Sequence, residues 1–69
     1  MYLHDAMVEV LRKRPGRRAH RADIADEINR RQLFARRDGN PVPPNQVSAR
    51  ASKRRDVFRL LGGGFIGLR

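Results

Sequence analysis

Apolar residues in the first part of the chain recur with the period of an amphipathic helix. They fall at i, i+4, i+7 and i+8, a spacing that places them on one face: Leu3, Met7, Val10 and Leu11. Acidic side chains lie on the other side. Pro15-Gly16 ends the pattern, because both residues disfavour further helical backbone. We therefore predict a first helix over residues 3–13.

A second apolar stripe follows a link at residues 17–19 that is long enough for a single strand pair. The stripe consists of Ile24, Ala25 and Ile28, and it is extended by Leu33-Phe34. Acidic residues come early in this segment and arginines come late, which suits the dipole of a helix. His20 is placed to cap the N-terminus, with Asp23 as the partner in a variant of the capping box. We predict a second helix over residues 21–32.

The next segment, ARRDGNPVPP at residues 35–44, is rich in residues that favour turns. Pro44 suits the first position of a helix, where a missing N–H leaves no hydrogen bond unmade. Val47 and Ala51 follow one turn apart, so they provide a narrow apolar edge. A third helix is predicted over residues 44–54.

After Asp56 the apolar pattern changes from helical spacing to alternation. Two alternating runs flank Gly62-Gly63-Gly64, and a glycine loop between such runs predicts a β-hairpin, called here the wing. A three-glycine loop pairs Leu61 with Phe65, Leu60 with Ile66, and Phe58 with Leu68. The core face of the wing would then comprise Phe58, Leu60, Ile66 and Leu68. The outer face would comprise Val57, Arg59, Leu61, Phe65 and Arg69.

The order of these elements predicts one small α+β domain over residues 1–69. Three helices can cover the inner face of a C-terminal hairpin and so enclose a single two-layer core. This arrangement is a winged helix, which is a helix-turn-helix followed by a β-hairpin wing. The second and third helices would form the helix-turn-helix.

The ordered set of segments resembles the HARE-HTH family, winged-helix domains found in restriction endonucleases and chromatin-associated proteins. The resemblance covers nearly the whole chain and lies in four stretches: LHDAMVEVL, ADIADEINRRQLF, VPPNQVSARASKR and VFRLLGGGFIGLR. It implies binding to double-stranded DNA by an accessory module of a restriction or regulatory protein. It also implies that such a module directs attached activities to DNA, including DNA with modified bases.

The charge of the chain favours a polyanionic partner. The formal net charge is +9, and arginine supplies nearly all of the positive charge, since Lys13 and Lys53 are the only lysines. Arginine matches phosphate groups and guanine edges well, although a genome that favours arginine codons would give the same composition. The chain has no cysteine, which excludes disulfides and cysteine-bound zinc.

On a helical wheel, the polar side chains of the third helix lie away from the core edge. Asn45, Ala49, Ser52 and Lys53 lie opposite Val47, with Gln46 and Ser48 at the margins. Asparagine and glutamine can pair with adenine, and alanine can contact the methyl group of thymine. This face suits a recognition helix in the major groove, and an ordinary solvated helix face is the alternative.

The candidate DNA-binding residues come from three segments. The helix provides Asn45, Gln46, Ser48, Ala49, Arg50, Ser52, Lys53 and Arg54. The loop before it provides Arg36 and Arg37, and the outer face of the wing provides Arg59. Contacts from the cations to phosphate would position the domain without specifying sequence.

Other functions have fewer features in their favour. We expect no enzyme, metal or cofactor, because the only histidines, His4 and His20, lack cysteine or paired acidic partners. The glycine run is no phosphate loop, since a strand follows it. We expect a soluble cytoplasmic protein, associated with the nucleoid in a bacterium, because no segment has the roughly 20 apolar residues of a membrane span or the features of a signal peptide.

Two alternative functions remain open at this stage. One is a protein-interaction module, with Leu61 and Phe65 as its anchors, and the other is RNA binding driven by charge. The apolar pair has two explanations. Either the first helix or a chain terminus covers it, or it contacts a protein or the sugars of DNA.

Overall fold

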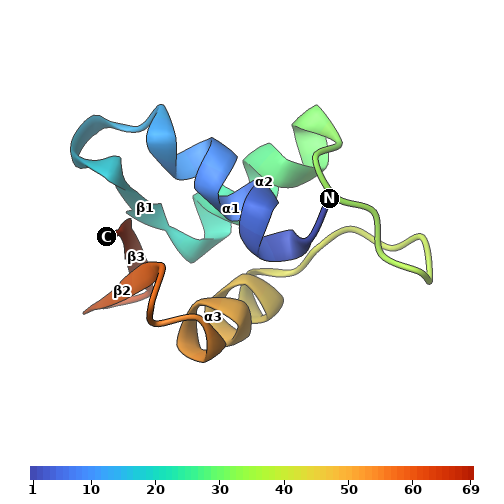
Figure 1. Ribbon diagram of the computed structural model, residues 1–69. Helices are drawn as coiled ribbons and strands as arrows, with labels where there is room; N and C mark the ends of the chain where they lie inside the picture. Colours follow the sequence, from blue (N-terminus) through green and yellow to red (C-terminus); the bar gives the residue numbers. More distant parts are fainter.

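A computed structural model of residues 1–69 contains three helices and a three-stranded antiparallel sheet (Figure 1). The helices are α1 (Leu3–Arg12), α2 (Arg21–Arg31) and α3 (Pro44–Lys53), and a 3-10 turn, η1, spans Pro15–Arg17. The strands are β1 (Arg18–His20), β2 (Phe58–Gly62) and β3 (Phe65–Leu68). The predicted α+β class is therefore confirmed, and the architecture is that of a small winged-helix-like domain. Each helix ends one residue before the predicted boundary.

The sheet has the strand order β1-β3-β2, so the short link before α2 forms an edge of the sheet. It pairs with the wing as Arg18 with Gly67, Ala19 with Ile66, and His20 with Phe65. The prediction of a single strand pair at 17–19 underestimated this contact, which extends over three residue pairs. As a result, the wing is joined by hydrogen bonds to the segment that leads into α2.

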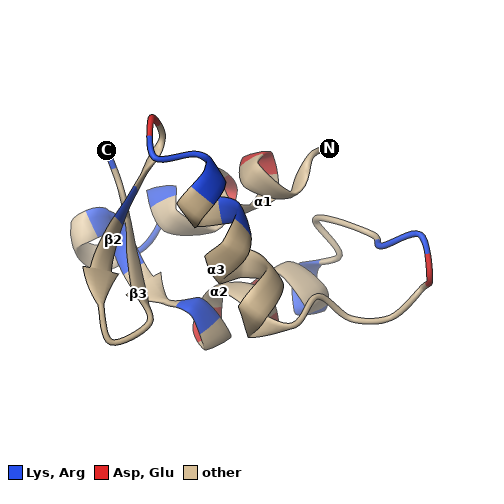
Figure 2. Cartoon of the chain, turned by 90° about the horizontal axis from the view of Figure 1, so that it is seen from below, with Lys and Arg blue, Asp and Glu red and all other residues tan.

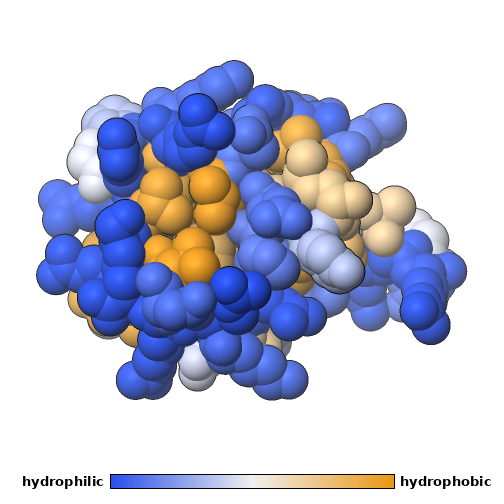
Figure 3. Space-filling view, in the orientation of Figure 1, coloured by the Kyte–Doolittle hydropathy of each residue, from blue (hydrophilic) through white to orange (hydrophobic).

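The core lies between the three helices and the inner face of the sheet. Each strand contributes one fully inward side chain, and these are Ala19, Phe58 and Ile66. The rest of the core comes mainly from α1 and α2, whose buried residues match the predicted apolar stripes. The large apolar side chains that remain exposed lie at the N-terminus and on the wing: Met1, Tyr2, Leu60, Leu61 and Phe65. In the view of Figure 3 the surface is mostly hydrophilic, with one apolar patch on the side of the sheet and a second near the N-terminus.

The wing differs from its prediction at the loop. Gly62, not Leu61, is the partner of Phe65, because the register shifts by one residue between Leu60 and Gly62. Gly62 is the last residue of β2, and the turn is formed by Gly63 and Gly64. All three glycines have positive φ, at 85°, 60° and 83°, which glycine adopts without steric cost. Leu61 is consequently the extra residue of a β-bulge.

The burial of the wing also differs from the prediction. Leu60 was expected in the core, yet it is 42% exposed, whereas Phe58 on the same strand is completely buried. Leu68 is only partly buried. Val57 was expected on the outer face, yet it packs against the core from the turn before β2. Phe58 and Ile66 are the residues that anchor the wing to the core.

One side chain fixes the long connection between α2 and α3. The amide oxygen of Asn29 accepts a hydrogen bond from the backbone N–H of Val42 at 2.8 Å, and its nitrogen donates to the carbonyl of the same residue at 3.0 Å. Val42 is 3% exposed and belongs to the core. The side chain of Asn29 on α2 thereby satisfies both the N–H and the carbonyl of Val42. Val42 lies two residues before the start of α3.

The end of α2 explains why the predicted apolar stripe leaves the helix. Gln32 adopts the left-handed conformation with φ 56°, and the N–H of Leu33 bonds to the carbonyl of Ile28 at 3.0 Å. This is a Schellman-type ending. Leu33 and Phe34, expected to extend the helix stripe, instead pack against the core from the loop.

Glu27 joins the end of α1 to α2. Its carboxylate, 14% exposed, accepts hydrogen bonds from Arg14 and Arg31 at 2.9 Å each, and Arg30 lies 3.9 Å away. Burial acts to raise the pKa of Glu27, but the hydrogen bonds and charges of Arg31 and Arg14 outweigh it and lower the pKa. The ionised form is therefore stabilised by folding.

We predict that Asn29→Ala lowers the free energy of unfolding by about 2 kcal/mol, because two hydrogen bonds to a buried backbone are lost. Asn29→Asp should lose at least as much, since its second carboxylate oxygen would face the Val42 carbonyl with no proton to donate. Urea titration monitored by circular dichroism measures both. Asn40→Ala, at an exposed loop position, is the control. A loss no larger than that of the control would contradict the role given to Asn29.

We also predict that Glu27→Gln lowers stability by about 1–2 kcal/mol at neutral pH and makes the protein less sensitive to acid. The pKa of Glu27 is lower in the folded protein than in the unfolded chain, where it is about 4.3. The stability that Glu27 contributes is therefore complete above the unfolded pKa, and it is lost as the pH falls through the folded pKa. Urea midpoints between neutral pH and about pH 2 measure the effect. Parallel curves for the two proteins would show that this carboxylate does not contribute to the pH dependence.

Candidate nucleic-acid interface

The outward face of α3 is the first part of the candidate site. Val47 and Ala51 are completely buried, as predicted, and they attach the helix to the core by small side chains. The exposed residues of the helix are Asn45, Ala49, Arg50, Ser52 and Lys53, together with Pro44. Gln46 and Ser48 are half-buried at the margins, where the helical wheel places them. The helix thus presents amides, hydroxyls and a small apolar group to solvent.

No acidic residue interrupts this face. The first turn of α3 has none, and the last turn carries Arg50 and Lys53, whose charge also suits the negative end of the helix dipole. Figure 2 shows the middle of α3 free of charge, with cationic residues gathered at its C-terminal end. A neutral polar centre and a cationic end therefore share one helix face.

Cationic segments lie on both sides of α3. In Figure 2 the wing lies to one side of the helix, and the loop between α2 and α3 lies to the other. Arg59 belongs to the wing and Arg37 to the loop, and both are exposed. Neither of them, nor Arg50 nor Lys53, forms a salt bridge within the chain. These four cations are free to meet an anion.

Two of the predicted DNA-binding arginines have partners within the chain. The guanidinium of Arg36 lies 3.0 Å from the carboxylate of Asp38 and donates to the carbonyl of Pro41 at 3.2 Å. The guanidinium of Arg54 donates to both carboxylate oxygens of Asp56 at 3.1 Å and lies 3.3 Å from Nε2 of His4. Both arginines brace the segment in which they lie, so a phosphate contact would compete with an existing ion pair.

The acidic partners of these arginines have lowered pKa values. The backbone N–H of Asn40 is the main cause at Asp38, with the charge of Arg36 as a further one. At Asp56 the main cause is the hydrogen bond from Arg54, and the same bond raises the pKa of Arg54. Both carboxylates are exposed, so these pairs contribute little to stability and mainly set loop geometry.

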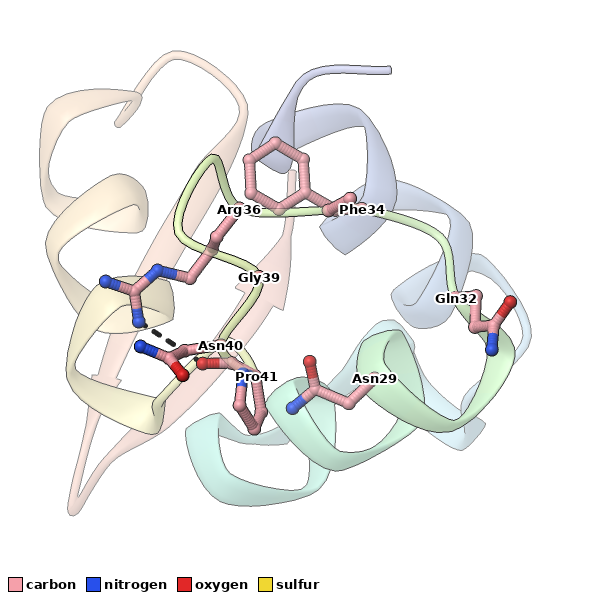
Figure 4. Close-up of a pocket in the computed structure, with 8 residues that line it drawn as sticks. Asn29, Gln32, Phe34, Arg36, Gly39, Asn40 and Pro41 are labelled. Carbon is pink, nitrogen blue, oxygen red and sulfur yellow. Dashed lines mark hydrogen bonds between the residues drawn. The ribbon is translucent and has the colours of Figure 1, made fainter.

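The largest hollow in the molecule, of about 500 Å³, lies between the end of α2 and the following loop (Figure 4). Its lining residues include Asn29, Phe34, Arg36 and Pro41. Asn29 is bonded to Val42, and Arg36 is bonded to Pro41. Because the side chains of Asn29 and Arg36 already have partners in the chain, this hollow follows from the bracing of the loop and is not the candidate site.

The sheet presents features that the sequence analysis missed. Leu61 and Phe65 are 40% and 47% exposed, so neither α1 nor a chain terminus covers them, and that explanation is wrong. His20 lies beside them, with its ring edge-on to Phe65 at a centroid distance of 5.2 Å. His20 also caps α2, as predicted, since its Nδ1 accepts from the N–H of Ala22 at 3.1 Å. Only the pairing of β1 with β3 brings these side chains together.

No protein-family model, curated protein or solved structure matches this chain. None of its helices has the length and apolar content needed to cross a bilayer. No group of three or more histidine, cysteine, aspartate or glutamate side chains is arranged to hold a metal ion. The site must therefore be interpreted from its own geometry.

We predict that Gly64→Ala destabilises the wing more than Gly62→Ala does. Both positions have positive φ, so both variants carry similar backbone strain. At Gly64, however, a β-carbon would stand 2.6 Å from Nε2 of His20, whereas at Gly62 it would meet nothing within 4 Å. Thermal unfolding of the two variants measures the difference. Equal midpoints would show that the ring of His20 moves aside without cost.

Proposed function

We propose that this domain binds double-stranded DNA by placing α3 in the major groove, as a HARE-HTH-like accessory module. The supporting observation is the arrangement around α3. An outward face of amides, hydroxyls and one methyl group, free of acidic residues, is flanked on both sides by unpaired cations. A neutral hydrogen-bonding centre with cationic margins matches a base-pair edge between two phosphate backbones.

The shape of α3 fits a groove. Its core face uses Val47 and Ala51, so the helix lies on the surface and exposes most of its circumference. The major groove of B-DNA is about 12 Å wide and admits one α-helix. Asn45, Gln46 and Ala49 are then the residues that can meet base edges, through adenine for the amides and thymine for the methyl group. Ser48 and Ser52 can donate to a base or a phosphate.

The unpaired cations supply the phosphate contacts in this proposal. Arg50 and Lys53 follow the groove at the end of α3, while Arg37 and Arg59 reach the backbones on its two sides. Through Asp38, Arg36 holds the loop that carries Arg37, and through Asp56, Arg54 holds the turn between α3 and the wing. Four phosphate contacts would give a slope of log affinity against log salt of roughly −3 to −4.

The same geometry favours duplex DNA over duplex RNA. The major groove of an A-form helix is deep and narrow, so side chains on a protein helix do not reach its bases. Charge alone would attract both polymers. A ten-residue helix with a neutral polar centre adds recognition only where the groove is wide.

We predict that Arg50→Ala combined with Lys53→Ala weakens binding to a short duplex by about 10- to 100-fold at low salt. The salt slope should fall by about 2, because two phosphate contacts are removed. Fluorescence anisotropy of a labelled duplex at several salt concentrations measures both, and circular dichroism checks the fold.

The matched control removes two cations from the segment after α1, which lies away from α3 in Figure 1. Lys13→Ala combined with Arg17→Asn keeps the same net charge as the test variant. Asparagine tolerates the positive φ of 52° at position 17. Similar losses for both double variants, or no affinity of the unaltered protein for duplex DNA at low salt, would overturn the proposal.

A further inference from the structure

The outer face of the sheet carries a row of two arginines with a glycine between them. Gly67 of β3 pairs with Arg18 of β1 on one side and with Arg59 of β2 on the other. Cross-strand partners lie on the same face of a sheet, so the two arginine side chains flank a position without a side chain. A β-carbon built at Gly67 would stand 3.8 Å from the β-carbon of Arg18, which confirms the shared face.

The next row of this face is aromatic and apolar. His20, Phe65 and Gly62 pair across the three strands. Leu61 leans back over the glycine of the first row, since its Cδ1 would lie 3.2 Å from a β-carbon at Gly67. The ring of Phe65 is 47% exposed, and the edge-on contact with His20 restricts its orientation. An oriented, half-exposed ring thus lies beside two arginines.

A hollow of about 300 Å³ opens on this face, lined by Arg18, Leu61, Gly62 and Phe65. No acidic residue lines it, and Arg18, its one charged lining residue, forms no salt bridge. The hollow therefore combines an apolar floor with uncompensated positive charge. Its ligand must offer a flat apolar surface and a negative charge next to each other.

We propose that this face binds an unpaired nucleotide of a DNA strand, with the base against Phe65 and the adjoining phosphate at Arg18, which lines the same hollow. The choice of nucleic acid as the source of the nucleotide rests on the proposed function. Stacking on an aromatic side chain needs an accessible base face, and in a duplex the neighbouring base pairs cover those faces. The ligand is therefore a strand end, a gap or a bulge next to the duplex that α3 holds.

A folded protein partner fits this face less well. Stable protein interfaces bury about 800 Å² on each partner, mostly around a continuous apolar centre. Here only Leu61 and Phe65 provide apolar surface, and each is half-buried already. Leu60, the other exposed apolar residue of the wing, has Ile66 as its cross-strand partner and so lies on the opposite face. The apolar area is the size of a base and not of a protein interface.

The experiment compares a blunt duplex with the same duplex carrying a short single-stranded extension, and both affinities are measured by fluorescence anisotropy. We expect the extension to raise affinity about 5- to 10-fold through one stacked base. Phe65→Leu should abolish this gain and leave the affinity for the blunt duplex unchanged, whereas Phe65→Tyr should retain it. Leu60→Ala, on the other face, is the control and should also retain it.

An extension of abasic sugar phosphates separates stacking from charge. It keeps the phosphates and lacks the bases, so we expect it to give less than half of the gain. An equal gain from the abasic extension, or a gain that survives Phe65→Leu, would overturn the inference. A 2-aminopurine base at the first unpaired position gives a second test that needs no variant, since its fluorescence should fall on binding. Unchanged fluorescence would likewise overturn the inference.

The same measurements distinguish this inference from the proposed function. Arg50→Ala with Lys53→Ala should weaken the blunt and extended duplexes by the same factor, so that their ratio is kept. If that variant has no effect on the blunt duplex while the gain still requires Phe65, the sheet site stands and the role of α3 fails. If the variant weakens both duplexes and no gain exists, the role of α3 stands and the sheet site fails.

Discussion

The position of α3 depends on the two hydrogen bonds between the side chain of Asn29 and the backbone of Val42. The connection from α2 to α3 is rich in proline and glycine, and such a segment has no regular hydrogen-bond partners of its own. Asn29 satisfies one buried residue of this segment from the neighbouring helix, and the side chain of Val42 enters the core. Pro43 and Pro44, which begin α3, follow Val42 directly. The hydrogen bonds between Asn29 and Val42 therefore set where α3 starts.

The acidic residues of the chain decide which cations remain free. Glu27 engages arginines at the end of α1 and on α2, while Asp38 and Asp56 engage one arginine each in the loops beside α3. Since there are only 7 acidic residues against 16 lysines and arginines, most cations have no partner. None of these pairs lies on the outward face of α3 or on the outer face of the sheet, so both faces stay uncompensated.

The helices and the wing could be predicted from the sequence because each has a local signal, such as Pro15-Gly16 after α1 or the glycine run in the wing. The contacts that join them could not. Nothing near Asn29 in the sequence indicates that its partner is Val42, and the three-residue strand β1 is defined only by the strand it pairs with. The outward face of α3 was predictable from helical spacing. The partners of Arg36 and Arg54, and the bulge at Leu61, depend on loop geometry that spacing does not specify.

The bulge has a consequence that a regular hairpin would lack. In the predicted register Leu61 pairs directly with Phe65, and two apolar side chains would cover the outer face at the tip of the wing. In the structure Gly62 takes that place, and Leu61 turns back over Gly67. The surface beside Phe65 is thereby open on the side of Gly62, while Arg18 and Arg59 flank the leucine. One additional residue in β2 thus converts a closed apolar pair into an open aromatic surface with cationic margins.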